Sequence, residues 1–370
     1  MELKEGYNLT EVGVIPEDWD VDATKNLASI TTGAKNTQDK NDDGMYPFFV
    51  RSQKVERINS YSFDGEAVLT AGDGVGTGKV FHYIDGKFDF HQRVYKISNF
   101  NEKLDGYFFF LYFSNNFLNR IMQMTAKSSV DSVRMDMIAN MPIPLPPSLE
   151  QRAIAEALSD VDVLITSLDQ LITKKLNLKQ GAMQQLLTGD KRLAGFTGNW
   201  EEKKIADVAP LQRGFDLPNR ELKRGNYPVV YSNGILNRHS TYKAKAPGVI
   251  TGRSGTIGKV TFIEEDYFPH NTTLWVTDFK GNNPKFIYYL YLFLKLERFS
   301  TGSGVPTLNR NDVHANSISI PPTSREQKAI AQILSDMDAE IEKLEQQREK
   351  YKAVKQGMMQ ELLTGKTRLT

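Results

Sequence analysis

The residues best suited to chemistry are nine basic side chains crowded between positions 213 and 259. They are Arg213, Arg220, Lys223, Arg224, Arg238, Lys243, Lys245, Arg253 and Lys259. Only Asp216 and Glu221 oppose them, so the segment has a local charge of +7, nine minus two. Such a surface suits phosphates, because neutralised phosphates release their counterions. The segment predicts contact with nucleic acid, to which Asn233 could add hydrogen bonds; a solvated basic face is the structural alternative.

The first half of the chain is less basic. Residues 1–145 carry 15 Lys/Arg and 20 Asp/Glu, whereas residues 196–320 carry 16 and 11. The candidate DNA contacts of the first half are therefore interleaved with acids, and folding would have to sort them onto one face. They are Lys35, Arg51, Lys54, Arg57, Lys79 and Arg93.

The glycine-rich segment AGDGVGTGKV at 71–80 resembles a nucleotide-binding loop, but its residues do not have the spacing of one. A Walker loop needs glycine six residues before its lysine, where Asp73 precedes Lys79, and Val80 replaces the magnesium-binding Ser or Thr. The second half has TGRSGTIGKV at 251–260. The recurring feature is thus a tight turn leading into a strand, and Lys79, Arg253 and Lys259 on it are possible DNA contacts.

No catalytic or metal-binding pattern emerges from the remaining candidates. The chain has no cysteine, and its five histidines lack metal-ligand spacing. His91 and His270 match between the two halves, and a structural role is predicted for them. No Ser-His-Asp arrangement and no methyltransferase motif of the Asn/Asp-Pro-Pro-aromatic type occurs. We therefore predict no active site, no metal and no cofactor in this chain.

The elements that position these residues are duplicated. EQRAIAEALSDVD from Glu150 returns as EQKAIAQILSDMD from Glu326, and KQGAMQQLLTG returns as KQGMMQELLTG, both at an offset of 176. Residues 150–193 and 326–369 share 24 identities in 44 positions. The layout is a variable region followed by a near-identical region, twice. It is also cyclic, since Arg368-Leu369 parallels Arg192-Leu193, and this suggests pseudo-two-fold symmetry.

Each near-identical region predicts a long helix. Both follow a Pro-Pro pair, and Ser148 with Gln151, like Ser324 with Gln327, has capping-box spacing. Apolar residues then alternate by three and four, which is a heptad seam. The predicted seam consists of Ile154, Leu158, Val161, Ile165, Leu168, Ile330, Leu334, Met337, Ile341 and Leu344. Lysines such as Lys175, Lys179 and Lys355 interrupt it.

A helix from about 149 to 187 would be roughly 58 Å long at 1.5 Å per residue. Its far end would extend beyond a domain of about 130 residues, so an antiparallel partner helix is expected. Packing of each helix on its own domain, or a parallel homodimer, are the alternatives.

The variable regions read as mixed α/β. Short strands are predicted at 46–50, 67–70, 79–83 and 94–97, and again at 229–231, 248–251, 259–263 and 273–276. An aromatic, helical run follows in each, at 107–113 and 286–294. The predicted fold class is α+β, with two mixed α/β domains separated by two long antiparallel helices that form an intramolecular coiled coil.

The predicted domains are 1–145, a spacer helix and linker at 146–195, a second domain at 196–320, and a second spacer helix at 321–370. The first residues, MELKEGYNLTEVG, lack the apolar core of a secretory signal. The longest apolar runs are too short for a bilayer, which takes about 20 residues. A cytoplasmic location is expected.

With these motifs the chain resembles the specificity subunits of type I restriction–modification systems. The resemblance covers essentially the whole chain and rests on two variable domains, each followed by a PP-x(2–3)-EQ-x-A-I-A helix that ends in KQG-x-M-Q-x-LLTG. It implies two target-recognition domains that each read half of a split duplex DNA site, with helices that set the gap and dock two methyltransferase subunits.

The resemblance further implies that S-adenosylmethionine belongs to the methyltransferase partner, which methylates adenine. ATP and magnesium would belong to motor–nuclease partners. Two other hypotheses remain open from the residues alone. One is a coiled-coil scaffold without DNA binding, and the other is a self-sufficient DNA-modifying enzyme, against which the missing cofactor motif argues.

Overall fold

The computed structural model describes residues 5–124, 132–301 and 307–369, and the chain forms two compact units. The first unit comprises Met1–Ser167 and Gln347–Thr370, and the second comprises Leu168–Gln346. Two long helices, α4 (Ser148–Thr188) and α8 (Ser324–Leu362), contribute to both units. Their 41 and 39 residues confirm the two predicted long helices.

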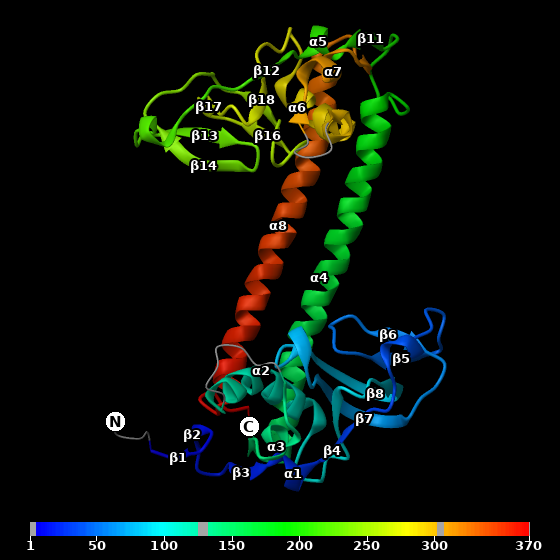
Figure 1. The fold of residues 1–370 in the computed structure, drawn as a ribbon, viewed down its shortest axis with the longest axis vertical. Coiled ribbons are helices and arrows are strands. Elements are labelled where there is room, and N and C mark those ends of the chain that lie inside the picture. Colours follow the sequence, from blue (N-terminus) through cyan, green and yellow to red (C-terminus); the bar gives the residue numbers. More distant parts are fainter. Residues whose placement is uncertain (1–4, 125–131, 302–306, 370) are drawn as a thin grey trace. The chain divides into compact units, whose positions relative to one another are not determined.

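The first unit is built on a six-stranded sheet of order β4-β9-β7-β8-β5-β6 (Figure 1). Its pairs are antiparallel except β5 with β8. The strands are β4 (Ser29–Thr32), β5 (Tyr46–Phe49), β6 (Glu56–Ile58), β7 (Phe63–Ala71), β8 (Phe81–Phe90) and β9 (Val94–Ser98). Two short pairs, β1 (Tyr7–Thr10) with β2 (Gly13–Pro16) and β3 (Asp20–Ala23) with β10 (Pro142–Leu145), complete the unit's strands.

The aromatic run of the first half forms α2 (Gly106–Met124), which is longer than the predicted 107–113. Its buried face, including Phe109 and Phe113, packs against Val68 and Ile97 of the sheet. Short helices α1 (Thr24–Leu27) and α3 (Met135–Ala139) flank it. The aromatic residues therefore form core, as expected for a run that is apolar on most of its faces.

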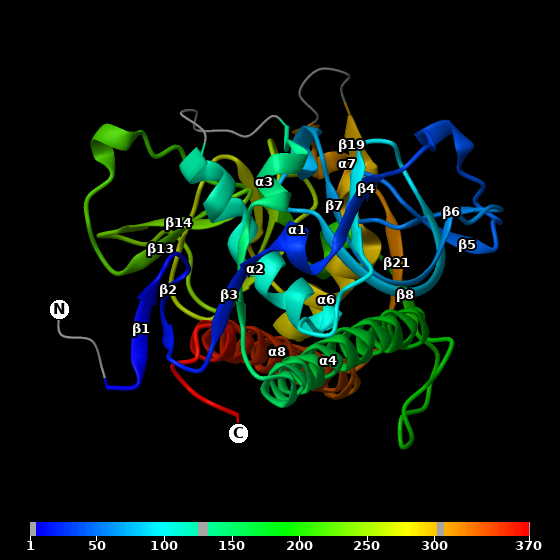
Figure 2. The same ribbon diagram turned by 90° about the horizontal axis from the view of Figure 1, so that it is seen from below.

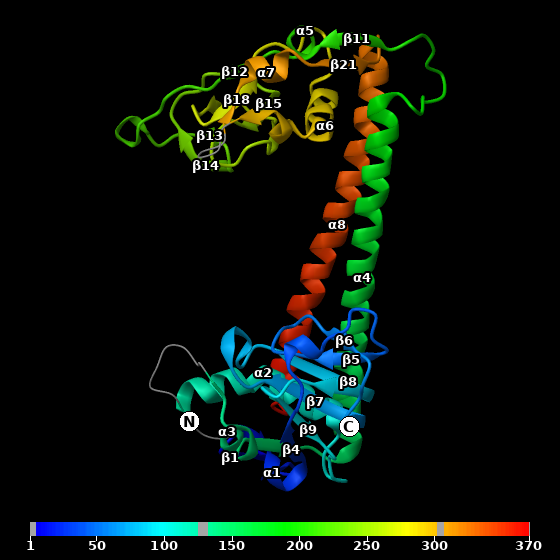
Figure 3. The same cartoon turned by 45° about the vertical axis from the view of Figure 1, so that its right-hand side comes forward.

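The second unit repeats this plan with shorter strands (Figure 3). A four-stranded sheet has the order β12-β18-β15-β16, and a three-stranded sheet has the order β14-β13-β17. The strands are β12 (Leu211–Arg213), β13 (Tyr227–Tyr231), β14 (Gly234–His239), β15 (Gly248–Gly252), β16 (Val260–Ile263), β17 (Phe268–Pro269) and β18 (Thr273–Val276). Helix α6 (Pro284–Leu294) packs on β15 and β16, as α2 packs in the first unit.

The remaining elements close the second unit. β11 (Glu201–Lys204) pairs with β21 (Ser317–Ile320), and β19 (Ser300–Thr301) pairs with β20 (Thr307–Leu308). Helices α5 (Ile205–Val208) and α7 (Arg310–His314) are short. Single 3-10 turns lie at Thr37–Asp39, Gly74–Gly76, Asn219–Glu221 and Leu296–Phe299.

Within each unit the two long helices lie side by side (Figure 2), and the ion pairs between them show that they run antiparallel. In the first unit Lys355 binds Asp162 at 2.6 Å, and in the second Lys179 binds Asp338. These two ion pairs are equivalent under the offset of 176. The lysines that interrupt the heptad pattern are therefore ionic cross-links between the helices. Antiparallel pairing follows because the residue number falls on one helix as it rises on the other.

The residues of the predicted seam differ in how deeply they are buried. Ile154 and Leu158 are fully buried in the core of the first unit, and Ile330 and Leu334 are equally buried in that of the second. Leu168 and Ile341 are also buried, whereas Val161, Ile165, Met337 and Leu344 are half-buried. The start of each helix thus belongs to the core of one unit, and its last turns, with Leu186 of α4 and Leu362 of α8, belong to the core of the other.

The predicted capping boxes are wrong. Gln151 Oε1 accepts from the Asp105 backbone N–H at 2.8 Å, and its Nε2 donates to backbone carbonyls of Lys103 and Pro146. Gln327 does the same with Asn283 N–H and Pro321. Each glutamine fastens its helix to the loop that begins the aromatic helix, where buried backbone groups need partners. At α8 the cap comes instead from Thr323, whose Oγ1 accepts from the Glu326 N–H at 3.3 Å.

A buried carboxylate lies at each end of the helix pair. The Glu150 side chain is 3% exposed and receives both arms of Arg368, at 2.7 and 2.8 Å, and Nε1 of Trp19 at 3.1 Å. In the second unit Glu326, 2% exposed, receives Arg192 at 2.7 and 2.8 Å and Trp200 at 3.3 Å. The predicted cyclic plan is real in this sense: the C-terminal residues complete the first unit.

Replacing Arg368 with alanine should lower the free energy of unfolding by about 3 kcal/mol, because Glu150 would remain buried without its cation. Urea denaturation followed by circular dichroism measures the loss. The matched control is Lys352→Ala, which removes an exposed pair with Glu349 on the same helix and should cost below about 0.5 kcal/mol. Equal losses in the two variants would contradict the role given to Glu150.

Candidate nucleic-acid interface

In the second unit, four strand ends meet around His270. The His270 N–H donates to the Val230 carbonyl of β13 at 3.0 Å, and Phe215 N–H, beyond β12, donates to Pro269 O at 2.8 Å. Arg253 N–H, just after β15, donates to Thr272 O at 2.8 Å. Loops from separate parts of the sequence are thereby held at one end of the sheets.

The first unit has the same frame around His91. The His91 N–H donates to the Phe49 carbonyl of β5 at 2.9 Å, and Gln92 N–H donates to Lys35 O at 2.8 Å. Gly72 N–H, just after β7, donates to Arg93 O at 2.8 Å. The predicted structural role of the matched histidines therefore has a concrete form, since each ties together several loop ends.

Both histidines act as hydrogen-bond acceptors. Nδ1 of His91 accepts from the Arg93 N–H at 2.9 Å, and Nδ1 of His270 accepts from Thr272 N–H at 3.4 Å. Burial, with Arg51 adding to it for His91, lowers the pKa of both rings below the ordinary 6.5. The rings are thus neutral at pH 7. Their contribution to stability is present above 6.5 and is lost as the pH falls through the lowered pKa, because a protonated Nδ1 cannot accept.

Two candidates of the first unit come together at this end. Arg51 binds Asp73 at 2.8 Å, and Arg93 lies 3.6 Å from the other oxygen of that carboxylate. The arginine side chains stay 44% and 63% exposed, so they can reach a ligand while Asp73 orients them. Folding does sort positive charge here, although the sequence of this half is acidic.

In the second unit the same end is hollowed into an open pocket of about 750 Å³. Arg213, Arg253 and Arg310 line it with amides of Gln212 and Asn309, and Asp216 is its one acidic residue. Arg213 binds Asp216 at 3.0 Å, and Asn271 donates to the same carboxylate oxygen. Within the described residues, the guanidinium of Arg253 makes no hydrogen bond or ion pair. The pocket is therefore cationic.

Several predicted contacts are engaged elsewhere. Arg57 donates to the carbonyls of Gly44 and Met45 at 2.8 and 2.7 Å, and so holds a turn. Arg238 makes a two-armed pair with Glu265 at 2.8 and 3.0 Å. Lys54 lies 3.3 Å from Glu56. These side chains have less free charge than the sequence alone suggests.

The other candidates are spread over the loops. Lys79, Lys223, Arg224 and Lys243 are exposed, and Lys35 is half-buried. Arg220 is 85% exposed beside Glu221, and Lys259 donates to the carbonyl of exposed Asn233 at 2.7 Å. Sequence reasoning missed Arg310, which lies beyond the basic segment. Its only signal in the sequence is that Asp312 and Asn316, just after it, repeat Asp136 and Asn140 of the first half.

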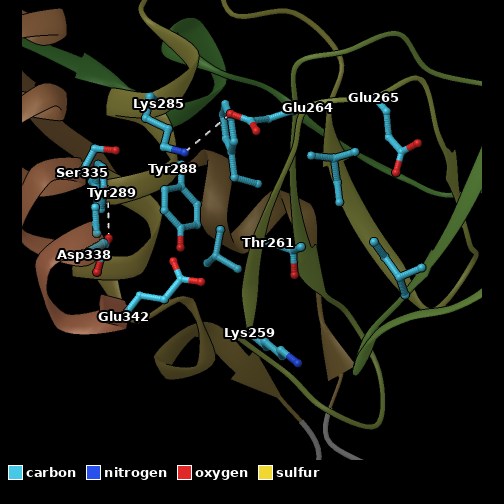
Figure 4. Close-up of a pocket in the computed structure, with 15 residues that line it drawn as sticks. Lys259, Thr261, Glu264, Glu265, Lys285, Tyr288, Tyr289, Ser335, Asp338 and Glu342 are labelled. Carbon is cyan, nitrogen blue, oxygen red and sulfur yellow. Dashed lines mark hydrogen bonds and ion pairs between the residues drawn. The ribbon is translucent and has the colours of Figure 1, made fainter. Parts of the chain in front are cut away.

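A second pocket, of about 830 Å³, lies between β16, α6 and the start of α8 (Figure 4). Asp338 accepts from Tyr289 at 2.7 Å and from Lys179, so one carboxylate joins α4, α6 and α8. Burial, reinforced by the bond to Asp338, raises the pKa of Tyr289, which keeps it a donor at neutral pH. These contacts fasten the α/β domain to the helix pair.

The described part of the chain lacks two features that would bear on function, a metal-ligand cluster and a membrane-spanning helix. No cluster of three or more His, Asp or Glu residues suited to a metal ion occurs there. Among the same residues, no helix combines the length and the apolar character needed to cross a bilayer.

Comparisons with known proteins agree on the family. The model of the type I restriction modification DNA specificity domain matches the chain twice, at residues 16–178 and 197–351. A type I restriction enzyme specificity subunit of Methanocaldococcus jannaschii is 25% identical, with 96% of this chain and 94% of that protein covered. The EcoDI specificity subunit of Escherichia coli is 32% identical over 45% of this chain and 35% of its own length.

The fold is also known. The crystal structure of a type I restriction–modification S subunit from M. genitalium matches with a TM-score of 0.69 at 16% identity, covering 98% of both chains. This confirms the predicted fold class. The two matched domains, the helix pair and the matched loop frames together account for the resemblance seen in the sequence. The chain belongs to the family of type I restriction–modification DNA specificity subunits, which recognise DNA without catalysing its modification and assemble with the other subunits of these systems.

Proposed function

We propose that each unit reads one half of a bipartite duplex DNA site, while the two long helices set the unread gap and dock two methyltransferase subunits. The observation that carries this proposal is the duplication itself. Two matches to one DNA specificity domain each include a helix locked by the same Glu-Arg-Trp cluster. Two readers on one chain suit a site with two halves.

The proposed division of labour within a reader follows from chemistry. Exposed lysines and arginines on the loops, such as Lys223 and Arg224, suit phosphates, which fix register and give salt-dependent affinity. The loop ends around His91 and His270 carry side chains on a hydrogen-bonded frame. A rigid frame suits base edges, since readout in the major groove requires donors and acceptors at fixed positions.

The helices suit a measuring role because they are long and cross-linked. At 1.5 Å per residue, 41 residues make about 61 Å of α4. Apolar side chains also remain exposed on the helices, including Leu149 at 81% and Val163 at 62%. In the proposed assembly the methyltransferase subunits would cover these residues.

Cofactors are proposed to reside in the partners. S-adenosylmethionine would bind the methyltransferase subunits, which methylate adenine, and ATP and magnesium would bind motor–nuclease subunits. The 71–80 segment of this chain lacks the Walker spacing needed for a nucleotide phosphate. This chain would recognise the DNA site, and its partner subunits would catalyse the reactions.

Deleting the gene from its host should abolish adenine methylation at one split motif. Methylation-sensitive sequencing of the genome, with and without the gene, measures this and reveals both half-sites. Complementation with the intact gene is the control. If the chain does not bind a methyltransferase in a pull-down and methylation is unchanged, the proposed function is wrong.

Exchanging residues 196–320 for the same region of a relative should change one half-site and leave the other intact, because each reader has its own core. The methylated motif is again the measurement. The reciprocal exchange of residues 1–145 is the matched control and should change the opposite half. A change of both halves in either chimera would contradict independent reading.

Inserting one heptad into each long helix, in register, should widen the gap by about three base pairs, since seven residues add about 10 Å and base pairs are about 3.4 Å apart. The spacing in the methylated motif reports the change. A heptad in one helix alone should break the ionic register and abolish methylation. An unchanged gap in the doubly extended chain would refute the measuring role.

A further inference from the structure

The two loop frames can be matched residue by residue through their backbone hydrogen bonds. Gly72 N–H donates to Arg93 O, and its carbonyl accepts from Val133 N–H at 2.7 Å. Arg253 N–H donates to Thr272 O, and its carbonyl accepts from Leu308 N–H at 2.8 Å. The strand pairing gives the same match, because Ala71 pairs with Val94 in the first unit and Gly252 pairs with Thr273 in the second. Arg253 is thus the structural equivalent of Gly72.

The side chains at this position differ between the two units, since the first has Gly72 where the second has Arg253. A Cβ at Gly72 would lie 3.0 Å from the Arg93 carbonyl oxygen and 3.0 Å from the Tyr95 ring, so a side chain there would require these neighbours to move. Tyr95 is held in place by a bond from its hydroxyl to Val133 O at 3.1 Å. In the second unit Leu274 replaces that ring, and the space is part of the cationic pocket.

The backbone of Arg253 and the surroundings of its side chain also suit a ligand. Its backbone is fixed on both sides, by Thr272 and Leu308, at 2.8 Å each. Its guanidinium has no partner among the described residues, whereas Arg213 is bound to Asp216. The side chain is half-buried in the pocket, so a ligand would be met by a largely pre-ordered arginine.

We propose that Arg253 is a specificity-determining residue of the second unit and reads a guanine in the half-site of that unit. Arginine pairs with guanine O6 and N7 through two parallel hydrogen bonds, the commonest specific contact in the major groove. The first unit has glycine and a tyrosine ring at the equivalent place, so no side chain makes this contact from that position. The inference rests on the proposed function.

The test uses the full chain in complex with its methyltransferase partner, and duplex oligonucleotides that carry the methylated motif or one base-pair change in it. For the wild type, replacing one G·C pair in the second half-site should weaken binding by about 10- to 100-fold. In Arg253→Ala that penalty should vanish, while the penalties at the other pairs persist. Arg253→Lys keeps the charge without the planar fork and should show an intermediate penalty.

Two controls separate the alternatives. Base changes in the first half-site should cost the Arg253 variants as much as the wild type, which shows that the protein is folded and engaged. Arg220→Ala removes an exposed arginine outside the pocket and should weaken all duplexes equally, if at all.

A uniform loss in Arg253→Ala, with every base preference kept, would mean a phosphate contact and would overturn the inference. A second half-site without any G·C pair would also overturn it. If the wild-type complex showed no split motif at all, the proposed function would fail instead.

Discussion

The structure depends on a carboxylate that is buried where each long helix begins. Glu150 and Glu326 are 3% and 2% exposed, and an unpaired buried charge would cost several kcal/mol. The arginine that neutralises each carboxylate comes from just beyond the end of the other helix. Neither unit is therefore complete with its own stretch of sequence, and the first requires the residues at the C-terminus. Antiparallel pairing of the helices is a direct consequence.

This constraint explains which parts of the fold the sequence could predict. The repeat, the long helices and the central strands of each sheet were predictable, because apolar periodicity and identical segments are local signals. The lysines at 179 and 355 looked like interruptions of the seam, since their acidic partners lie 159 and 193 residues away. Gln151 has capping spacing, yet its partners are the backbone groups of Lys103 and Asp105, which no local pattern reveals.

The candidate site divides in the same way. The basic segment was predictable from composition, and two of its residues, Arg213 and Arg253, do line one pocket. The sequence could not predict which basic side chains remain available to bind DNA. Arg238 is paired with Glu265, and Arg57 donates to two backbone carbonyls. Arg310 was missed because the fold, and not the chain order, brings it beside Arg253. Pairing across distant loops is a property of the folded chain alone.

Equivalent residues of the two units are likewise identified by their backbone hydrogen bonds and not by aligning the two sequences. Aligning Gly-Lys-Val in both copies places Asp73 opposite Arg253, but the strand ladders place Gly72 there. The loop of the second unit is two residues shorter, because Thr70 pairs with Phe81 whereas the equivalent Thr251 pairs with Val260. The constant parts of each reader are backbone bonds and a histidine that accepts one. Arg253 is one side chain that these bonds do not use, because the frame holds its backbone N–H and carbonyl and leaves its guanidinium without a partner among the described residues. Such an arrangement lets specificity vary while the helix pair and its buried carboxylates stay the same.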